Sequence, residues 1–378
     1  MPNNMVIEEH KEKKVRKQRY RYEVVDLFCG IGGLSYGLKT AGFHILAGYD
    51  LDWTCKFAYE TNTGGKFNYR DVNTITGDEI KKLYSKRKKT IRILAGCAPC
   101  QPFSSYAFKN KHKDPNKYDL LYQFGRLVGE VLPDIVTMEN VTQILNFKAK
   151  PVLQDFIDTL KSLGYSVDAR PVYCPDYGIP QTRKRLVLLA SRLGEIRLIP
   201  PTHDKKHYVT VRETIGKLRP ITAGGVDMFD PLHRTISLTP INLERIKATP
   251  PGGSWHDWPE ELILECHKKK EGKTYGSVYG RMEWDKPGPT MTTQCTGLGN
   301  GRFGHPEQDR AISVREAALL QTFPQTYKFF PDEENVSIIK ASRYIGNAVP
   351  PKLGEAIAQS IICHIKIVID HEETKTAN

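Results

Sequence analysis

The sequence predicts an α/β fold in which an open sheet flanked by helices is joined to a second, smaller and irregular domain. Short apolar runs typical of buried strands alternate with helical segments in the first half of the 378-residue chain. One of these strands runs into a glycine turn that opens a helix. Between residues 192 and 309 the alternation stops, and prolines and glycines interrupt short strand-like runs.

The first strand, Val24 to Phe28, leads into the turn Cys29-Gly30-Ile31-Gly32-Gly33, and a helix follows from Leu34. Strand, turn and helix form a cradle in which the backbone can approach a ligand closely. The spacing Gly-x-Gly-Gly lacks the turn that holds a pyrophosphate, which favours a ligand without phosphates. Asp50, at the end of the next strand, is placed to accept hydrogen bonds from ribose hydroxyls, and Asp71 to meet an adenine amino group. A tight turn without a ligand is the alternative.

Other polar residues stand beside strands, where open α/β sheets carry their chemistry. Cys100 follows the strand 91–95, and Glu139 follows the strand 134–138. The basic run Gln181 to Arg185 leads into the next strand, and the turn Gly346 to Pro351 precedes a C-terminal helix. Each feature alone has a simpler explanation. Cys100 is also typical of a core cysteine and Glu139 of a helix cap, while the basic run is typical of a strand edge and the turn of an ordinary loop.

Taken together and in order, six segments resemble the cytosine-5 DNA methyltransferase family. They are Asp26 to Gly33, Pro99-Cys100-Gln101, Glu139-Asn140-Val141, Gln181-x-Arg183-x-Arg185, Arg315 to Pro324 and Gly346-Asn347-Ala348-Val349. The resemblance runs from about Val24 to Gln359. It implies a Rossmann-like S-adenosylmethionine-dependent methyltransferase sheet with a smaller target-recognition domain. The chain then divides into a basic N-terminal arm (1–21), the first part of the catalytic domain (22–195), the target-recognition domain (196–310) and a return to the catalytic domain (311–378).

The resemblance implies that Cys100, Glu139, Arg183 and Arg185 are catalytic. Cytosine C5 is a poor nucleophile, and addition of a thiolate to C6 makes it enamine-like. Cys100 is the candidate thiolate, and Glu139 is the candidate that holds or supplies a proton at N3. Arg185 is similar in position to the family arginine that hydrogen-bonds the cytosine O2, and Arg183 resembles one that orients its neighbours.

The cofactor implied is S-adenosylmethionine, and no metal site is expected. The residues expected around the cofactor are Phe28, Cys29, Gly30, Ile31, Gly32, Gly33, Asp50, Leu51, Asp71, Val72, Pro99, Asn347, Ala348 and Val349. Since the last three lie far along the chain, the C-terminal helix must fold back beside the first strand.

Double-stranded DNA is the implied partner, with the target cytosine flipped out of the stack, because these groups cannot reach it inside a duplex. A lysine-rich loop, 104–119, is expected to close over the site and meet phosphates. The residues expected to contact DNA are Gln101, Ser104, Lys109, Lys111, Lys113, Gln181, Thr292, Thr293, Gln294, Asn300 and Arg302. The sequence read cannot be derived from spacing.

The composition agrees with a polyanionic partner: the formal net charge is +12 and the pI is about 9.1. Eight cysteines without a paired framework fit a reducing compartment. The sequence contains no apolar run long enough to span a bilayer and no signal-peptide pattern, so we expect a cytoplasmic protein, bacterial or phage-encoded.

Three alternative functions remain open at this stage. Cys97 and Cys100 also match the Cys-x-x-Cys motif of thioredoxin-like redox proteins, which is the first alternative. A tRNA cytosine methyltransferase would share the catalytic motifs, although the Cys-Phe-Thr signature expected there is absent. A catalytically inactive DNA-binding regulator is the third. For the enzyme, we expect a monomer that acts alone or beside a cognate restriction endonuclease.

Overall fold

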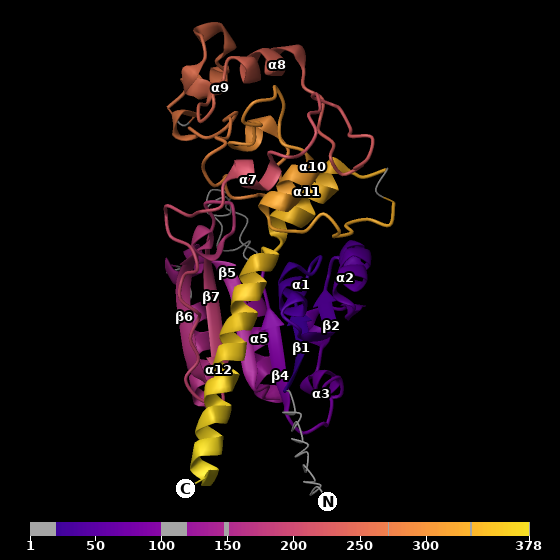
Figure 1. The fold of residues 1–378 in the computed structure, drawn as a ribbon, viewed down its shortest axis with the longest axis vertical. Helices are drawn as coiled ribbons and strands as arrows, with labels where there is room; N and C mark the ends of the chain where they lie inside the picture. The colour runs from indigo at the N-terminus through magenta and orange to yellow at the C-terminus, as the bar shows by residue number, and fades with distance from the viewer. Residues whose placement is uncertain (1–19, 100–118, 147–150, 271, 333–334, 378) are drawn as a thin grey trace, which may run out of the picture.

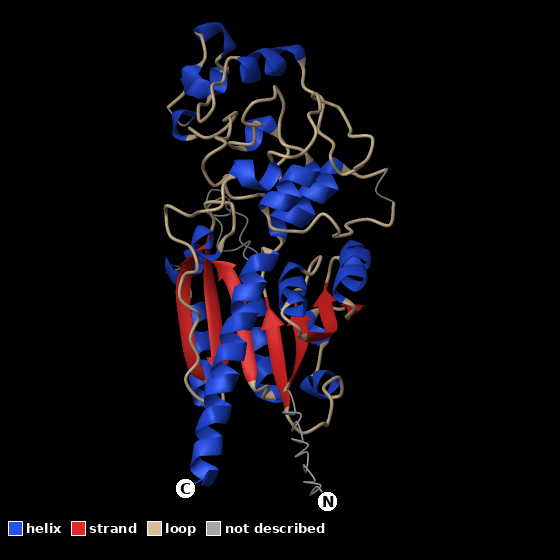
Figure 2. Ribbon diagram, in the orientation of Figure 1, coloured by secondary structure: helices blue, strands red, loops and turns tan. Residues whose placement is uncertain are grey.

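The computed structural model describes residues 20–99, 119–146, 151–270, 272–332 and 335–377. They form two lobes (Figure 1). The sheet lobe consists of the described residues up to 209 together with the long helix that follows residue 350. The irregular lobe consists of the described residues 210–350, in which short helices are joined by loops (Figure 2).

The sheet has seven strands in the order β3-β2-β1-β4-β5-β7-β6. Their bounds are β1 Arg21–Leu27, β2 His44–Asp50, β3 Lys66–Tyr69, β4 Thr90–Gly96, β5 Ile135–Val141, β6 Ser166–Tyr173 and β7 Lys184–Ser191. β7 runs in the direction opposite to that of the other six strands. The chain leaves β1 toward β2 on one side and later returns as β4 on the other. This reversal of strand order opens a crevice at the carboxyl edge, which faces the irregular lobe (Figure 2).

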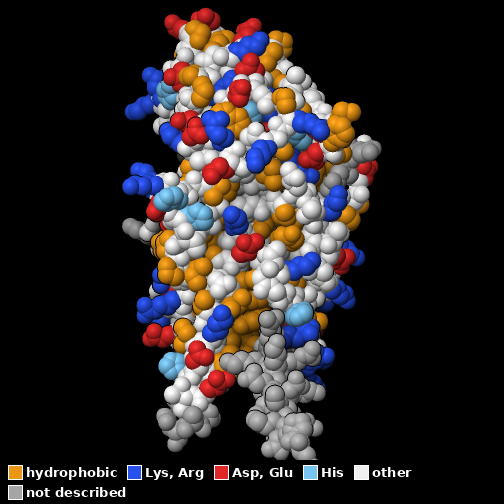
Figure 3. All heavy atoms as spheres, viewed as in Figure 1, with side chains coloured by type: hydrophobic (Ala, Val, Ile, Leu, Met, Phe, Trp, Pro, Cys, Tyr) orange, Lys and Arg blue, Asp and Glu red, His pale blue; other side chains and the backbone are white. Residues whose placement is uncertain are grey.

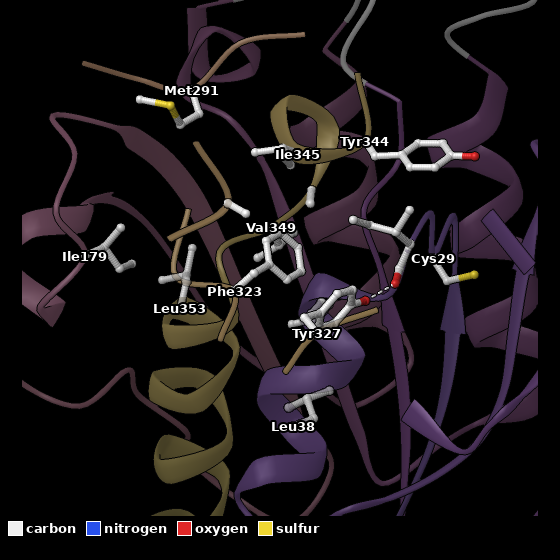
Figure 4. Packing of buried hydrophobic residues seen from close by; sticks show 14 of the residues in the cluster. Cys29, Leu38, Ile179, Met291, Phe323, Tyr327, Tyr344, Ile345, Val349 and Leu353 are labelled. Carbon is white, nitrogen blue, oxygen red and sulfur yellow. Dashed lines mark hydrogen bonds between the residues drawn. The ribbon is translucent and has the colours of Figure 1, made fainter. Parts of the chain in front are cut away.

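Helices cover both faces of the sheet. One face packs against α1 (Gly33–Thr40), α2 (Lys56–Thr63) and α12 (Pro351–Ala377), and the other against α3 (Gly77–Lys81), α5 (Asp119–Val131) and α6 (Val152–Ser162). Side chains of β1 alternate between the two apolar layers, as the two-residue period of a strand requires: Val24 faces the first and Val25 the second. The first layer continues into the irregular lobe, so the two lobes share one core (Figure 4).

The irregular lobe contains α7 (Val211–Ile215), α8 (Pro240–Lys247), α9 (Glu265–Lys268), α10 (Val314–Leu320) and α11 (Ile338–Asn347). Its loops are held by buried guanidinium groups, which supply donors to carbonyls that no sheet satisfies. Arg281 donates to the carbonyls of Ile246 (2.6 Å), Thr249 (2.8 Å) and His305 (3.0 Å). Arg310 forms a fully buried two-point ion pair with Glu316, at 2.8 and 2.7 Å.

The sequence expectations for the sheet lobe are met in the described residues, with two strands added. Strands occur at the five places where they are expected, and β3 and β6 are the additional ones. The segment 311–347, expected with the catalytic domain, contains α10 and α11, which lie beside α7 in the irregular lobe (Figure 1). Only α12 returns to the sheet. Within the described residues, no helix combines the length and the apolar character needed to cross a bilayer.

Helices α1 and α12 approach each other through glycine. A Cβ on Gly37 would lie 2.1 Å from the carbonyl oxygen of Pro351 and 2.8 Å from the Cα of Gly354. Neither neighbour is a flexible side chain end, so the two helix backbones must separate if Gly37 gains a methyl group.

We therefore expect Gly37→Ala to lower the free energy of unfolding by ~1–3 kcal/mol, the usual cost of overpacking. The matched control is Gly129→Ala in α5, where a Cβ would meet only Leu163 Cδ1 at 3.7 Å. That variant should be neutral or gain up to about 1 kcal/mol from helix propensity. Urea unfolding measures both, and equal midpoints for the two variants would contradict the steric argument.

Candidate active site

A cavity of about 330 Å³ opens at the crevice where strand order reverses. Its walls come from the carboxyl ends of β1, β2, β4 and β5, from the segment that begins β7, and from α11 with the turn after it. Since β7 is antiparallel, its beginning lies at the same edge as the ends of the parallel strands. Segments more than 300 residues apart in sequence therefore meet around one space.

The glycine turn after β1 is shaped by left-handed backbone conformations. Phe28, Gly30 and Gly32 have φ angles of 57°, 50° and 89°. A Cβ placed on Gly30 would meet no atom within 4 Å, so this part of the turn faces open space. The N–H of Gly30 donates to Asp50 Oδ2 at 2.7 Å, and this bond fixes the end of β2 against the turn. A positive φ at Phe28 is uncommon for a non-glycine residue and is typical of functional sites.

The turn after α11 closes the cavity from the far end of the chain. A Cβ on Gly33 would lie 2.1 Å from the carbonyl oxygen of Val349, so only glycine allows this contact. Tyr327 adds a second link, because its hydroxyl donates to the carbonyl of Ile31 (Figure 4). In the same figure Val349 and Cys29 flank this contact.

Asp26 is a buried carboxyl group in the cavity wall. Ser35 Oγ donates to its Oδ2 at 2.7 Å, while its Oδ1 has no hydrogen-bond partner. Burial raises the pKa of Asp26 to about 7, and the nearby Asp50 carboxylate adds to the effect, against the Ser35 hydrogen bond. Burial likewise raises the pKa of Asp50, although backbone hydrogen bonds oppose it.

Two buried thiols, Cys29 and Cys55, also line the cavity. Burial raises the pKa of each well above the usual range, and the Asp50 carboxylate adds to the increase. Both thiols are therefore neutral at pH 7 and poor nucleophiles. Pro99 lines the cavity, and the expected nucleophile Cys100, the next residue in the chain, lies outside the described residues.

Glu139 and Arg185 face each other in the wall opposite the glycine turn. Arg185 Nε lies 2.9 Å from Glu139 Oε1, and both side chains are largely buried. The contact is an ion pair without hydrogen-bond geometry, and Glu139 Oε1 makes no hydrogen bond. Arg185 Nη1 donates to the carbonyl of Lys184 at 2.7 Å, which fixes the guanidinium group. The cavity wall thus holds a carboxylate directly beside a guanidinium group.

Arg183 is buried and joins the lobes. Its Nη1 donates to the carbonyl of Met291 at 3.1 Å and its Nη2 to that of Ala348 at 3.3 Å. Asn140 fixes the neighbouring strand end, since its Nδ2 donates to the carbonyl of Ala98 at 3.2 Å. These polar contacts hold the backbone on both sides of the cavity.

Most of the residues expected around a cofactor meet in this cavity. Those that line it are Phe28, Cys29, Gly30, Ile31, Gly33, Asp50, Pro99, Asn347, Ala348 and Val349. Four others do not line it: Gly32, Leu51, Asp71 and Val72. A Cβ on Gly32 would meet Tyr59 and Thr63, Leu51 is exposed, Asp71 accepts hydrogen bonds from Asn73, and Val72 packs in the second apolar layer.

The residues expected to contact DNA are less uniformly placed. Gln101, Ser104, Lys109, Lys111 and Lys113 lie outside the described residues. Thr292, Thr293, Gln294 and Asn300 are exposed on the irregular lobe, and Arg302 Nη1 donates to the carbonyl of Gly253 at 2.7 Å. Thr292, Asn300 and Arg302 line an open groove of about 440 Å³ that also contains Thr182.

Gln181 requires a correction, because it is completely buried and both ends of its amide are bonded within the protein. A side chain with no exposed surface cannot contact DNA in this arrangement, and its position is that of a link between the lobes.

Sequence reasoning did not single out several lining residues, among them Asp26, Asp52, Cys55 and Tyr344. A charged residue within the apolar run of the first strand was a usable signal for Asp26. No local pattern marks Tyr344, whose hydroxyl donates to the Thr54 carbonyl at 2.7 Å across the cavity mouth.

The sheet order, the glycine turn and the cavity at the switch point define the class of fold: a Rossmann-like α/β sheet. Solved structures support the fold. A chain described as a DNA modification methyltransferase from an Escherichia coli prophage aligns with a TM-score of 0.70 at 22% identity, over 91% of this chain and 99% of that one. The S. pombe Dnmt2 methyltransferase aligns with a TM-score of 0.56 at 18% identity, over 90% of this chain and 98% of that one.

The C-5 cytosine-specific DNA methylase family matches residues 22–363, and the chain belongs to this family. It is 54% identical to the Type II methylase M.HgiDII of Herpetosiphon aurantiacus, over 89% of this chain and 94% of that protein. It is 29% identical to the Type II methyltransferase M1.HphI of Haemophilus parahaemolyticus, over 89% and 86%. The protein is accordingly a DNA (cytosine-5)-methyltransferase, and its cofactor is S-adenosylmethionine.

The raised pKa of Asp26 makes stability depend on pH. Because folding favours the protonated carboxyl, this group's contribution is fully present below the unfolded pKa, about 4, and is lost as pH rises toward about 7. Asp26→Asn keeps an acceptor for Ser35 and removes the titration. We expect the variant to gain on the order of 2 kcal/mol over the wild type at pH 8 and much less at pH 4.5. Urea unfolding at both pH values measures the difference, and parallel pH profiles would refute it.

Proposed function

We propose that the cavity transfers a methyl group to C5 of a flipped-out cytosine in duplex DNA, with Cys100, Glu139 and Arg185 as catalytic residues and Arg183 as the residue that holds the surrounding backbone. The observation that carries this proposal is the ion pair of Glu139 and Arg185 in the cavity wall, in which a buried carboxylate oxygen has no hydrogen-bond partner. The pair supplies an acceptor or proton donor beside a cation, which suits recognition of one polar edge of a base.

The cavity fits S-adenosylmethionine. Open space at Gly30 admits a ligand against the backbone, Asp50 stands beside it for the ribose hydroxyls, and the free Oδ1 of Asp26 suits a cationic or hydrogen-bond-donating group. Phe28 contributes an aromatic ring to the wall. When bound, the cofactor supplies an electrophilic methyl group on a sulfonium, and the turn 347–349 closes the pocket around it.

In the proposed reaction the Cys100 thiolate adds to C6 of the cytosine, and the electron density moves toward N3. Glu139 holds or delivers a proton at N3, which stabilises the adduct. Arg185 donates hydrogen bonds to the cytosine O2, where negative charge also develops. C5, now nucleophilic, would take the methyl group from the sulfonium, whose S–C bond breaks to leave a neutral thioether. Loss of the C5 proton to a base then expels Cys100, and return of the N3 proton to Glu139 restores the cytosine ring.

The exposed residues of the irregular lobe support a DNA-reading role. Thr292 and Asn300 line the groove that also contains Thr182, which lies between the buried Gln181 and Arg183 in sequence. The face shown in Figure 3 mixes Lys and Arg with Asp and Glu over both lobes. This face, which contains α12, thus has no concentration of positive charge that would attract DNA. We place the DNA on the surface where the groove and the cavity open.

We also propose that the enzyme protects DNA beside a cognate restriction endonuclease. The relatives named as Type II methylases, at 54% and 29% identity, support this pairing. Every part of the proposed cavity is supplied by one chain, so a monomer is sufficient for the reaction.

The first test is transfer of a labelled methyl group from S-adenosylmethionine to mixed-sequence duplex DNA and, separately, to tRNA. We expect label at cytosine C5 in DNA, and a loss of at least 10³-fold with Cys100→Ala. Cys266→Ala, which changes an exposed thiol on α9, is the matched control and should retain full activity. Label confined to tRNA would replace the proposed substrate, and DNA binding without any transfer would favour a regulator.

Glu139→Gln keeps the size of the side chain but removes its charge and its ability to exchange the N3 proton. We expect methyl transfer to fall by ~10²–10⁴-fold, the usual share of a general acid, while affinity for S-adenosylhomocysteine changes less than about threefold. Glu195→Gln, at an exposed position, is the control. Single-turnover transfer and calorimetric titration give the two quantities; unchanged transfer would remove Glu139 from the mechanism.

A further inference from the structure

Gln321 is a fully buried residue that lines neither the cavity nor the groove. It follows the last residue of α10, and both ends of its amide are used. Its Oε1 accepts from Gln181 Nε2 at 2.5 Å, and its Nε2 donates to the carbonyl of Ala348 at 2.6 Å. Ala348 belongs to the cavity wall, so Gln321 holds that wall from behind.

Gln181 extends the same network to the groove side. Its Nε2 also donates to the carbonyl of Leu320 at 2.9 Å, and its Oε1 accepts from the N–H of Met291 at 3.0 Å. Met291 is buried, and the residue after it, Thr292, is exposed in the groove. The pair of glutamine amides thus joins the backbone at the groove to the backbone at the cavity.

Arg183 makes a second bridge between the same two points, from Met291 to Ala348. The carbonyl of Ala348 therefore accepts from both Arg183 and Gln321. Steric contact reinforces this link: a Cβ on Gly346 would lie 2.2 Å from the backbone carbon of Thr292. The turn 346–349 is therefore in direct backbone contact with residue 292 on one side and with Gly33 on the other. It cannot shift toward either of them without a steric clash.

We propose that Gln321 is a positioning residue for methyl transfer, which sets the turn 347–349 around the cofactor and, through Gln181, the backbone of 291–294 against DNA. This inference rests on the proposed function of the cavity and groove. Because the amide touches neither ligand, its replacement acts on both binding steps at once and only through the backbone that it holds.

Two substitutions separate the parts of the amide. Gln321→Glu keeps the acceptor for Gln181 but replaces the donor to Ala348 by an oxygen, so two acceptors face each other. Gln321→Met keeps the approximate volume and removes both bonds. Gln359→Glu makes the same chemical change at an exposed position of α12 and is the matched control.

The experiment measures, for each full-length variant, the Kd of S-adenosylhomocysteine and the KM and kcat for the duplex DNA that the wild type methylates, with the active fraction determined by titration. We expect both Gln321 variants to raise the Kd about tenfold and the KM at least fivefold, with kcat per active site falling less than threefold. Gln359→Glu should match the wild type. A double-mutant cycle with Gln181→Met should be non-additive, since the two amides are directly bonded.

A purely structural role would lower the active fraction and leave the Kd and KM per active site unchanged, and that result would overturn the proposal. A rise in the Kd alone would overturn the link to the DNA side. Failure of the wild type to bind S-adenosylhomocysteine or to methylate DNA would refute the proposed function instead, which separates the two failures.

Discussion

The turn at residues 346–349 is the constraint on which the site depends. It is held against the glycine turn at Gly33 and against the loop at Thr292 by contacts too close for any side chain. Hydrogen bonds from Arg183 and Gln321 to one carbonyl, that of Ala348, fix it further. The cavity is consequently a product of tertiary contact, since its walls come from both ends of the chain and no single segment encloses it.

The two lobes achieve rigidity by different means. The sheet lobe satisfies its backbone through strand ladders and helices, whereas the irregular lobe relies on buried arginines such as Arg281 and Arg310. The lowered pKa of Glu316, which results from its ion pair with Arg310 despite burial, is consistent with a permanently charged pair in that interior. Loops fixed in this way can present polar groups to a ligand without the regular spacing of a sheet.

The sheet and the glycine turn could be predicted from sequence because strand-length apolar runs and adjacent glycines are local signals. The strand β6 gives no such signal. It lies at the sheet edge and its residues are mostly part-exposed, so Asp168, Arg170 and Pro171 break up its apolar pattern. Many of the motif residues line one cavity, but a motif cannot distinguish a residue that would contact a ligand from one that supports the backbone. Gln181 belongs to the motif and is buried, whereas Tyr344 lines the cavity without belonging to any recognised pattern.

The reversed direction of β7 has a consequence for modular exchange. Arg183 directly precedes β7 and Arg185 is its second residue, and both line the cavity. The strand ends at the opposite edge of the sheet, so the chain after it runs back along α12, where Ile199 N donates to Ser360 Oγ at 2.9 Å. The irregular lobe is thus an insertion whose second junction lies within the cavity wall. A graft that carried α11 would import part of the cavity wall. Because Gln321, which follows α10, donates to Ala348 in the cavity wall, the segment that can be exchanged between relatives without rebuilding this wall ends before α10.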